Sequence, residues 1–426
     1  MKPLAATGFA ALGAALIAVA YGLARFAFGL FVPPIRADLG LSPDVIGIVG
    51  SLAFVSFILA SMVAPVLAHR LGARNTAVLA GLFAVGGLML ISQARDEFML
   101  GAGVFACGLC TGLMMPALSS AVQSVVSPGL QDRVNAVMNA GTSVGIALSV
   151  PAVLFMAGAW RWAYASFAVL AGIGVVAAWL FIPSASRVSS DAPASLLRIT
   201  VRQWWALARL CGFGFGMGLI SASYWVFAPD LVVGIGEMPS HLTGWLWLAV
   251  GVAGLAGAAS SDFAARNGAA ITQAVGWLGL CAAIALIAAS PSQLPTAVVS
   301  AGVFGAAYMT LSGLYLVTGI RWLPDHPSVG PVLPFLSIAI GQAVGSPLAG
   351  WLVKQLGYAD AFAAIAAAGL LLAMLSPLFP VHRSPQAELP LPRPEPATDA
   401  ASEPTSQPAT EPATPTATAE PVEPRP

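Results

Sequence analysis

Charged residues are the scarcest class in this sequence. They make up 8% of its 426 residues, whereas hydrophobic residues make up 58% and the mean hydropathy is +0.84. Because a soluble domain has about 25% charged residues, this composition excludes an ordinary soluble protein and indicates a polytopic membrane protein. The 18 basic residues balance the 18 acidic ones, so the net charge gives no reason to expect nucleic acid as a partner.

Cysteine and histidine are equally scarce, with four residues of each. Cys107-x-x-Cys110 lies in an apolar segment without a nearby histidine or acid, so we interpret the pair as small packing residues and predict no disulfide. The sequence has no cluster of His, Asp or Glu on facing segments of the kind that metal or acid-base chemistry requires. We therefore predict that the protein is not an enzyme and holds neither a metal nor a cofactor.

Long apolar runs, in contrast, are abundant. About 20 apolar residues cross the hydrocarbon core of a bilayer as a helix, which satisfies its own backbone polar groups. Twelve segments approach or exceed this length, at 5–32, 44–68, 75–92, 98–126, 135–157, 161–182, 205–228, 242–259, 270–289, 295–320, 329–352 and 359–379. The first exceeds the apolar core of a signal peptide and has no polar cleavage region after it, so we expect it to remain uncleaved.

The longest interruption between the apolar segments divides them six and six. We predict an N-terminal half at 1–182, a central cytoplasmic loop at 183–203 and a C-terminal half at 204–380. Residues 381–426 are dominated by Pro, Ala, Thr, Ser and Glu. Such a composition buries too little apolar surface to offset the entropy of ordering, so a disordered cytoplasmic tail is expected.

Basic residues in short loops predict the orientation, because they collect on the cytoplasmic side of a membrane. If the N-terminus is inside, the opposite side holds only Arg36, Arg95, Arg161 and Lys354. The cytoplasmic side then holds Lys2, Arg70, Arg74, Arg133, Arg187, Arg198, Arg202, Arg266, Arg321 and Arg383. We therefore predict a multi-pass protein of the inner or plasma membrane with both termini in the cytoplasm.

Short matches between the two halves indicate an internal repeat, as many transporters have. Four matches occur in the same order at offsets of 192 to 200 residues: Ala73-Arg74-Asn75 with Ala265-Arg266-Asn267, Val104-Phe105 with Val303-Phe304, Gly141-x-x-x-Gly145 with Gly341-x-x-x-Gly345, and Trp160–Tyr164 with Tyr358–Phe362. Small residues four apart let helices approach closely, so we interpret the glycine pairs as packing sites.

Twelve segments, the six-plus-six division and a basic loop after the second segment resemble the major facilitator superfamily. In that family the loop typically reads Gly-x-Leu-Ala-Asp-Arg-x-Gly-Arg-Arg, and residues 65–74 keep Leu67, Arg70, Gly72 and Arg74, with His69 in place of the acid. The resemblance implies an all-α integral membrane fold of 12 transmembrane helices in two pseudo-symmetric six-helix halves, working by alternating access. It also implies a cytoplasmic gate, formed by His69, Arg70, Gly72, Arg74, Asp262 and Arg266.

Motifs of the family's proton-driven drug exporters are missing. Their fourth helix carries Arg-x-x-x-Gly-x-x-x-Gly, where this sequence has Val104 in place of the arginine. Their fifth helix carries Gly-x-x-x-Gly-Pro-x-x-Gly-Gly, of which only Gly141-x-x-x-Gly145 remains. The resemblance to multidrug antiporters is therefore poorer than the resemblance to the superfamily.

Arg25 is the one strongly basic residue well inside an apolar segment. A charge at the centre of a membrane helix costs about 2.5 to 3.5 kcal/mol, so it indicates a functional site. No Asp or Glu lies deep in any of the twelve segments, and Asp230, at the end of the seventh, is the nearest acid. A buried charge needs a partner, and a guanidinium suits a carboxylate. We therefore predict a small organic anion near Arg25. The structural alternative is that Arg25 snorkels outward or binds helix-terminal carbonyls across the bundle.

Polar and aromatic residues on the segments expected to line the transport cavity complete the candidate site. Tyr21 and Phe28 lie near Arg25 on the same helix. The facing segments contribute Ser221, Tyr224, Trp225, Tyr308, Ser312, Tyr315, Gln123 and Gln342. Such a pocket, with one cation, hydroxyl groups and flat apolar walls, suits a small organic anion.

Two other functions stay open at this stage. The aromatic content favours efflux of drugs or of neutral or amphipathic metabolites by the same fold, and a membrane-embedded receptor or enzyme is the distant alternative. Proton-coupled carriers need a titratable group in the membrane, so uniport, exchange or carriage of a proton with the substrate is expected here. We expect a monomer whose partners are the small-molecule substrate and the lipid bilayer.

Overall fold

The computed structural model describes residues 6–184, 200–255, 257, 260–323 and 329–375, and all the regular structure within these residues is helical. The N-terminal part consists of α1 (Ala6–Ile17), η1 (Ala18–Phe26), α2 (Ala27–Leu39), α3 (Pro43–Ser92), α4 (Glu97–Val125), α5 (Pro128–Leu148), α6 (Val150–Met156), η2 (Ala157–Ala159) and α7 (Trp160–Phe181). The C-terminal part consists of α9 (Val201–Gly234), η4 (Ser240–Leu242), α10 (Thr243–Gly254), α11 (Ser260–Asn267), α12 (Ala269–Ala289), α13 (Leu294–Trp322), α14 (Val329–Leu356) and α15 (Tyr358–Leu375). Most of the predicted central loop and all of the predicted tail lie outside the described residues.

Each of the twelve predicted segments coincides with helix in the described part of the chain. Ten of these helices are long and apolar enough to cross a membrane. The ten helices correspond to eleven predicted segments, because α3 holds two, and the remaining segment corresponds to α10. The 50 residues of α3 hold two predicted segments, separated at Gly72 by a non-helical backbone with φ of 79°. The 12 residues of α10 are too few to span a bilayer.

Glycine ends a helix at corresponding places in the two halves. Gly72 has φ of 79° and Gly268 has φ of 85°, a conformation that glycine adopts without steric cost. In both places a threonine four residues later donates its hydroxyl to the glycine carbonyl at 2.9 Å. The sequence match of the two Ala-Arg-Asn triplets is therefore wrong, because residues 73–75 follow their glycine whereas residues 265–267 precede theirs.

The two Gly-x-x-x-Gly pairs hold helices together, as predicted. A Cβ atom on Gly145 of α5 would lie 2.2 Å from the carbonyl oxygen of Ala18. In the second half, a Cβ on Gly345 of α14 would lie 2.2 Å from the carbonyl oxygen of Leu219 in α9. Only glycine permits such a backbone approach. The first helix of each half is thus packed on the fifth helix of the same half in the same way.

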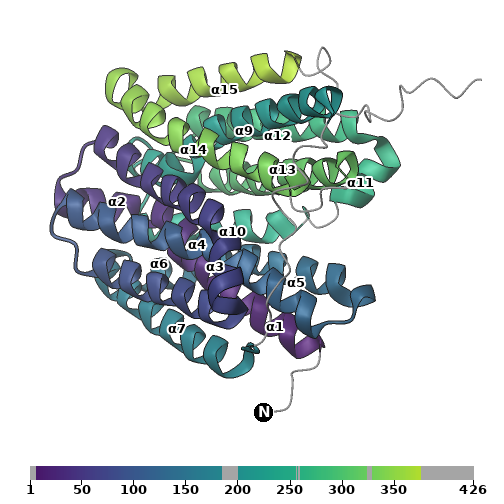
Figure 1. The fold of residues 1–426 in the computed structure, drawn as a ribbon. Coiled ribbons are helices and arrows are strands. Elements are labelled where there is room, and N and C mark those ends of the chain that lie inside the picture. Colours follow the sequence, from purple (N-terminus) through teal and green to yellow (C-terminus); the bar gives the residue numbers. More distant parts are fainter. Residues whose placement is uncertain (1–5, 185–199, 256, 258–259, 324–328, 376–426) are drawn as a thin grey trace, which may run out of the picture. The chain divides into compact units, whose positions relative to one another are not determined.

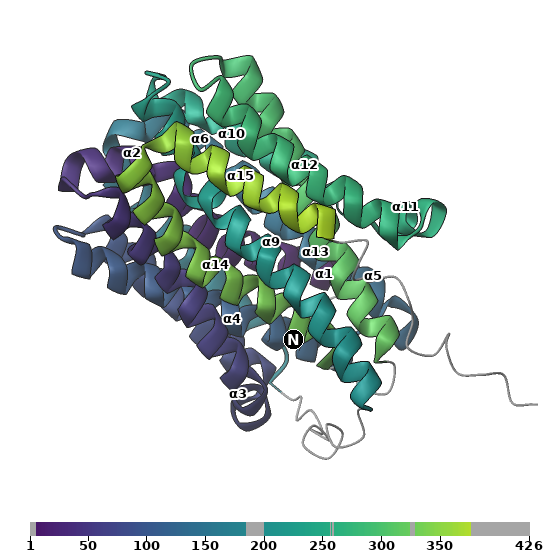
Figure 2. The same cartoon turned by 90° about the horizontal axis from the view of Figure 1, so that it is seen from above.

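The helices of the two halves gather into two groups within Met1–Ala387. Figure 1 shows the N-terminal helices in purple and blue on one side, and the C-terminal helices in green and yellow on the other. Figure 2, turned by 90°, shows α15 beside α12. Residues of α15 contact both α12 and α9. The groups meet where α3 packs on α14, α2 on α9 and α5 on α10.

A partly buried polar cluster joins the groups at one end. Arg36 of α2 donates to the carboxylate of Asp230 in α9 and, at 2.6 Å, to the hydroxyl of Tyr358 in α15. Tyr358 donates its hydroxyl to the same carboxylate. Asp230 is 4% exposed. We call Arg36, Asp230 and Tyr358 the Asp230 cluster. A second ion pair between the halves joins Asp44, at the N-terminus of α3, to Lys354, near the C-terminus of α14.

Candidate functional site

The candidate site is built on η1, a nine-residue π-helix between α1 and α2. A π-helix has wider turns than an α-helix and is rare, and it is frequent at functional sites. Here the amide of Ala27 still donates to the carbonyl of Gly22, five residues earlier. Gly22 presses on α5, since a Cβ there would lie 2.2 Å from the carbonyl carbon of Gly145. The widened segment, fixed by this contact, carries Arg25 in its last turn.

Arg25 is enclosed by aromatic rings. It is 8% exposed, and its guanidinium carbon lies 4.6 Å from the ring centroid of Phe57, 4.9 Å from that of Phe54, 5.2 Å from that of Phe26 and 6.0 Å from that of Tyr21. Each ring presents a partial negative charge to the cation, and such contacts strengthen when water is excluded. The rings therefore compensate part of the cost of burying Arg25 without neutralising it.

The polar contact of Arg25 is with a neutral side chain of the other half. Its Nη2 donates to Oε1 of Gln342 in α14 at 3.3 Å, and Nε2 of Gln342 donates to the hydroxyl of Tyr308 in α13 at 3.1 Å. The Nε atom of Arg25 is buried and has no partner among the described residues. Of the charged side chains that the structure describes, only Arg25 and Asp230 are buried, and Asp230 is paired with Arg36. Arg25 thus has no acidic partner there.

An aromatic wall continues from Arg25 into the second half. The ring of Trp225 in α9 lies 4.3 Å from that of Phe26, and it meets Tyr308 edge-on at 5.2 Å. Trp247 of α10 donates its indole N–H to the carbonyl of Phe26 at 3.0 Å. This hydrogen bond uses a backbone carbonyl of η1, so the second half also supports the π-helix.

Several predicted site residues lie together. Arg25, Gln342 and Tyr308 form one hydrogen-bonded chain, and Trp225 packs beside it. Tyr21 contacts the guanidinium with its ring, and its hydroxyl donates to the carbonyl of Thr111 in α4 at 3.1 Å. A further predicted residue, Ser312, is buried one helical turn along α13 from Tyr308.

Other predicted site residues lie elsewhere or are engaged locally. Ser221 donates to the carbonyl of Gly218 in its own helix rather than facing Arg25. Tyr224 shares a hydrogen bond of 2.8 Å with Ser300, and Tyr315 accepts one of 2.9 Å from Trp277. Phe28 is buried in α2, outside the ring cage, and Gln123 is exposed on α4. None of these five makes a hydrogen bond or ring contact with Arg25 within the described residues.

Phe26, Phe54 and Phe57 are the site residues that sequence reasoning missed. The expectation for Phe28 assumed an α-helical turn of about 3.6 residues, in which positions three apart share a face. In the structure Phe26, the last residue of the π-helix, contacts the cation, whereas Phe28 belongs to α2. Phe54 and Phe57 are three apart on α3, which is a signal for one shared face, but the sequence does not say which helix that face meets.

Within the described residues, the contacts of Arg74 and Gly72, two of the predicted gate residues, lie in the N-terminal half. His69 and Arg70 are exposed at the end of the first part of α3. Arg74 donates to the carbonyl of Trp179 in α7 at 3.4 Å, and a Cβ on Gly72 would lie 3.4 Å from the carbonyl oxygen of Ser184. Arg266 is exposed in α11, and the side chain of Asp262 lies outside the described residues. A gating role for this loop stays a prediction.

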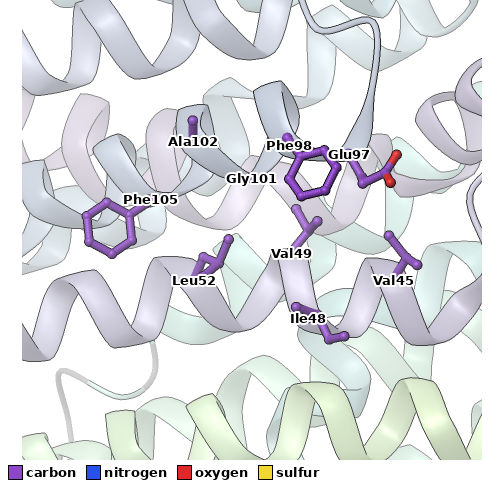
Figure 3. A pocket seen from close by; sticks show the side chains of 9 residues that line it. All are labelled: Val45, Ile48, Val49, Leu52, Glu97, Phe98, Gly101, Ala102 and Phe105. Atoms are coloured by element: carbon purple, nitrogen blue, oxygen red, sulfur yellow. The ribbon is translucent and has the colours of Figure 1, made fainter.

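A separate groove of about 400 Å³ lies between α3 and α4. Figure 3 shows the side chains around it, which are Val45, Ile48, Val49, Leu52, Glu97, Phe98, Gly101, Ala102 and Phe105. Its wall includes one close approach of the two helices, because a Cβ on Gly101 of α4 would lie 3.0 Å from Cδ1 of Leu52 in α3. The groove is apolar apart from Glu97, and neither Arg25 nor its partners Gln342 and Tyr308 line it. It therefore does not suit an anion.

Two groups of membrane-spanning helices with a buried polar site at their boundary define a membrane transporter of the major facilitator type. A family model described as "Uncharacterised MFS-type transporter YbfB" matches residues 17–377, and the chain belongs to this family. No curated protein matches the sequence.

Solved structures share the fold at low sequence identity. The nucleoside transporter NupG is 14% identical with a TM-score of 0.71, over 88% of this chain and 98% of that one. A POT family transporter in complex with 5-aminolevulinic acid is 14% identical with a TM-score of 0.69, over 88% and 96%. A bacterial homolog of the human lysosomal transporter Spinster is 12% identical with a TM-score of 0.70, over 90% and 98%. Family and neighbours identify a transporter rather than an enzyme.

Proposed function

We propose that this transporter moves a small organic anion, a carboxylate, by alternating access, and that Arg25 binds it. The observation that carries the proposal is the buried guanidinium without an acidic partner in the described residues and with a buried Nε that makes no hydrogen bond. An uncompensated buried charge is strongly destabilising, whereas a carboxylate would pair with it through charge-assisted hydrogen bonds.

The position of the site suits a carrier. Arg25 belongs to the N-terminal half, whereas Gln342 and Tyr308 belong to the C-terminal half. In carriers of this type the substrate binds between the repeats, and the two repeats rock about it. A substrate at Arg25 would touch groups on both sides of that boundary, so its binding energy can bias the equilibrium between the two orientations.

Efflux of drugs or of neutral metabolites is the second candidate, and the aromatic wall of Phe26, Trp225 and Tyr308 favours it. A cationic drug would have to approach Arg25, which repels it in a site of low dielectric constant. The wall suits equally the flat apolar body of an organic anion. The cation therefore makes the anion the better-supported substrate.

The test is transport by purified protein in proteoliposomes. Uptake and counterflow are measured with monocarboxylates, dicarboxylates, amino acids and cationic dyes, for the wild type, Arg25→Lys and Arg25→Ala. A hydrogen bond to a charged group contributes about 1.5 to 3 kcal/mol, so we expect Arg25→Ala to weaken transport of an anion by about 10- to 100-fold. Arg95→Ala, which removes an exposed arginine, is the matched control. Anion transport by Arg25→Ala at the wild-type rate would sink the proposal.

The predicted orientation belongs to the same proposal. With both termini in the cytoplasm of the inner or plasma membrane, the Asp230 cluster lies at the outer end of the bundle. An impermeant thiol reagent applied to intact cells tests this placement. In a variant without the native cysteines, Ile235→Cys, an exposed position after α9, should react, whereas Arg70→Cys should react only in permeabilised cells.

A further inference from the structure

We propose that Gln342 sets the charge of the substrate, and that the site is selective for anions with one negative charge over those with two. The inference rests on the proposed function, since it concerns the anion at Arg25. It follows from three observations: the number of buried cations, the way Gln342 is held, and the part of Arg25 that remains available.

The charge balance limits the substrate to one negative charge. Arg25 is the one basic side chain classed as buried among the described residues. A monocarboxylate would leave the occupied site neutral. A dicarboxylate would add a charge for which the site offers no second cation, and an uncompensated ion in the interior costs several kcal/mol. A site with one guanidinium thus discriminates by charge as well as by shape.

Gln342 is the residue at which this balance is decided. It is 1% exposed, and it contacts the guanidinium directly through Oε1. A glutamate there would place a carboxylate on Arg25, so the internal ion pair would take the place of the substrate. A lysine would add a second cation within reach of the first. The neutral amide satisfies one N–H of Arg25 while leaving its charge intact.

The backbone around Gln342 keeps it in this place. A Cβ on Gly218 of α9 would lie 2.0 Å from the carbonyl oxygen of Ile338 and 2.9 Å from the amide nitrogen of Gln342. The glycine therefore lets α14 press against α9 at the turn that carries Gln342. At the far end of the side chain, Tyr308 accepts a hydrogen bond from Nε2. With Nε2 occupied by Tyr308, Oε1 is the atom directed at Arg25.

The remaining part of Arg25 suits one carboxylate. Phe54 and Phe57 lie within 5 Å of the guanidinium carbon and crowd the planar group. One nitrogen is engaged by Gln342, while Nε is buried without a partner among the described residues. A carboxylate at Nε would accept from this unpaired donor, and an organic body attached to it would lie against the aromatic wall.

The experiment compares probes that differ by one carboxylate. Proteoliposome uptake is measured with benzoate against terephthalate and with propionate against succinate, for the wild type, Gln342→Asn, Gln342→Glu and Gln342→Lys. We expect at least tenfold preference for the monocarboxylates in the wild type and in Gln342→Asn. Gln342→Glu should lose uptake of both at least tenfold, and Gln342→Lys should shift the preference at least tenfold towards the dicarboxylates. Gln93→Glu, at an exposed position, is the matched control.

The outcomes separate this inference from the proposed function. If Arg25→Ala abolishes anion uptake but the wild type prefers dicarboxylates, or Gln342→Lys leaves the preference unchanged, the role of Gln342 is wrong while the anion proposal stands. If Arg25→Ala transports anions normally, both are wrong. Unfolding temperatures of the purified variants identify any that fail to fold. If Gln342→Glu fails to fold, the comparison of Gln342→Lys with Gln342→Asn still tests whether Gln342 sets the preference between monocarboxylates and dicarboxylates.

Discussion

We predict that a substitution in the Asp230 cluster shifts the equilibrium between the states closed and open at this end of the bundle. Arg36 of the N-terminal half bonds to Asp230 and Tyr358 of the C-terminal half. These bonds exist only while the halves are together at this end, so the opening of this end in our proposed mechanism must break them. Asp230→Asn keeps the shape of the side chain and removes its charge. The state closed at this end should therefore lose stability relative to the open one.

The magnitude follows from the type of hydrogen bond lost. A bond to a charged partner contributes about 1.5 to 3 kcal/mol and a neutral one about 0.5 to 1.5 kcal/mol. The side chain of Asp230 is 6% exposed and that of Arg36 is 25% exposed, so the contact is largely protected from solvent. The expected change is about 1 to 2 kcal/mol, or about 5- to 30-fold in the ratio of closed to open molecules.

Spin-label distances measure this ratio. Ala37 and Ile235 are exposed at the same end of the bundle, one in each half, and cysteines there, in a variant without the native cysteines, carry the labels. Asp230→Asn should raise the longer-distance population, whereas Glu237→Gln, which alters an exposed acid nearby, should leave it unchanged. Arg36→Gln and the double variant Arg36→Gln/Asp230→Asn complete a double-mutant cycle. Coupled residues show non-additive effects in such a cycle. Identical distance distributions in all variants, or strictly additive effects, would refute the reasoning.

Three further predictions concern packing and the ring cage. Gly145→Val forces a side chain into the backbone of η1, so we expect a loss of about 1 to 3 kcal/mol in stability, seen as a lower unfolding temperature; a variant as stable as the wild type would contradict the contact. Gly72→Ala strains a backbone with φ of 79° and ψ of 164° and should cost about 1 to 3 kcal/mol, whereas Gly86→Ala, in open space on the same helix, should not destabilise. Phe57→Leu removes the ring nearest Arg25 and should weaken anion binding about 2- to 5-fold, for about 0.5 to 1 kcal/mol of cation–π energy. Ligand-induced thermal stabilisation measures this affinity, and an unchanged value would show that the ring only fills space.

The sequence predicted the fold well because the bilayer imposes a simple rule. A span needs a certain length of apolar helix, so hydropathy alone located segments that coincide with helix in the described residues, including α10, whose helix is shorter than a full crossing. The same rule singled out Arg25, because a charge is costly in such a segment. Where hydropathy applied, no knowledge of the neighbouring helices was needed.

The surroundings of Arg25 could not be predicted in this way, because they depend on which helices meet. Ser221 and Gln342 were both expected on facing segments, yet Ser221 bonds to its own helix and only Gln342 of α14 bonds to Arg25. The π-helix arises where Gly22 meets Gly145 from a different helix, so no periodicity within residues 18–26 reveals it. The partners of Arg25 and the position of the π-helix depend on which helices pack together, and helix pairing cannot be deduced from a single sequence.

The first membrane-spanning segment carries two cations that reach the other half, and their partners differ in kind. Arg36 meets a buried acid, so its charge is balanced within the protein and the contact needs nothing from outside. Arg25 meets an amide and four aromatic rings, so its hydrogen bonding and its charge are satisfied only in part. An ion pair between the halves favours one orientation, whereas an unbalanced cation between them favours a ligand. The same residue type, on one helix, therefore supports a conformational contact at the end of the bundle and our proposed anion site within it.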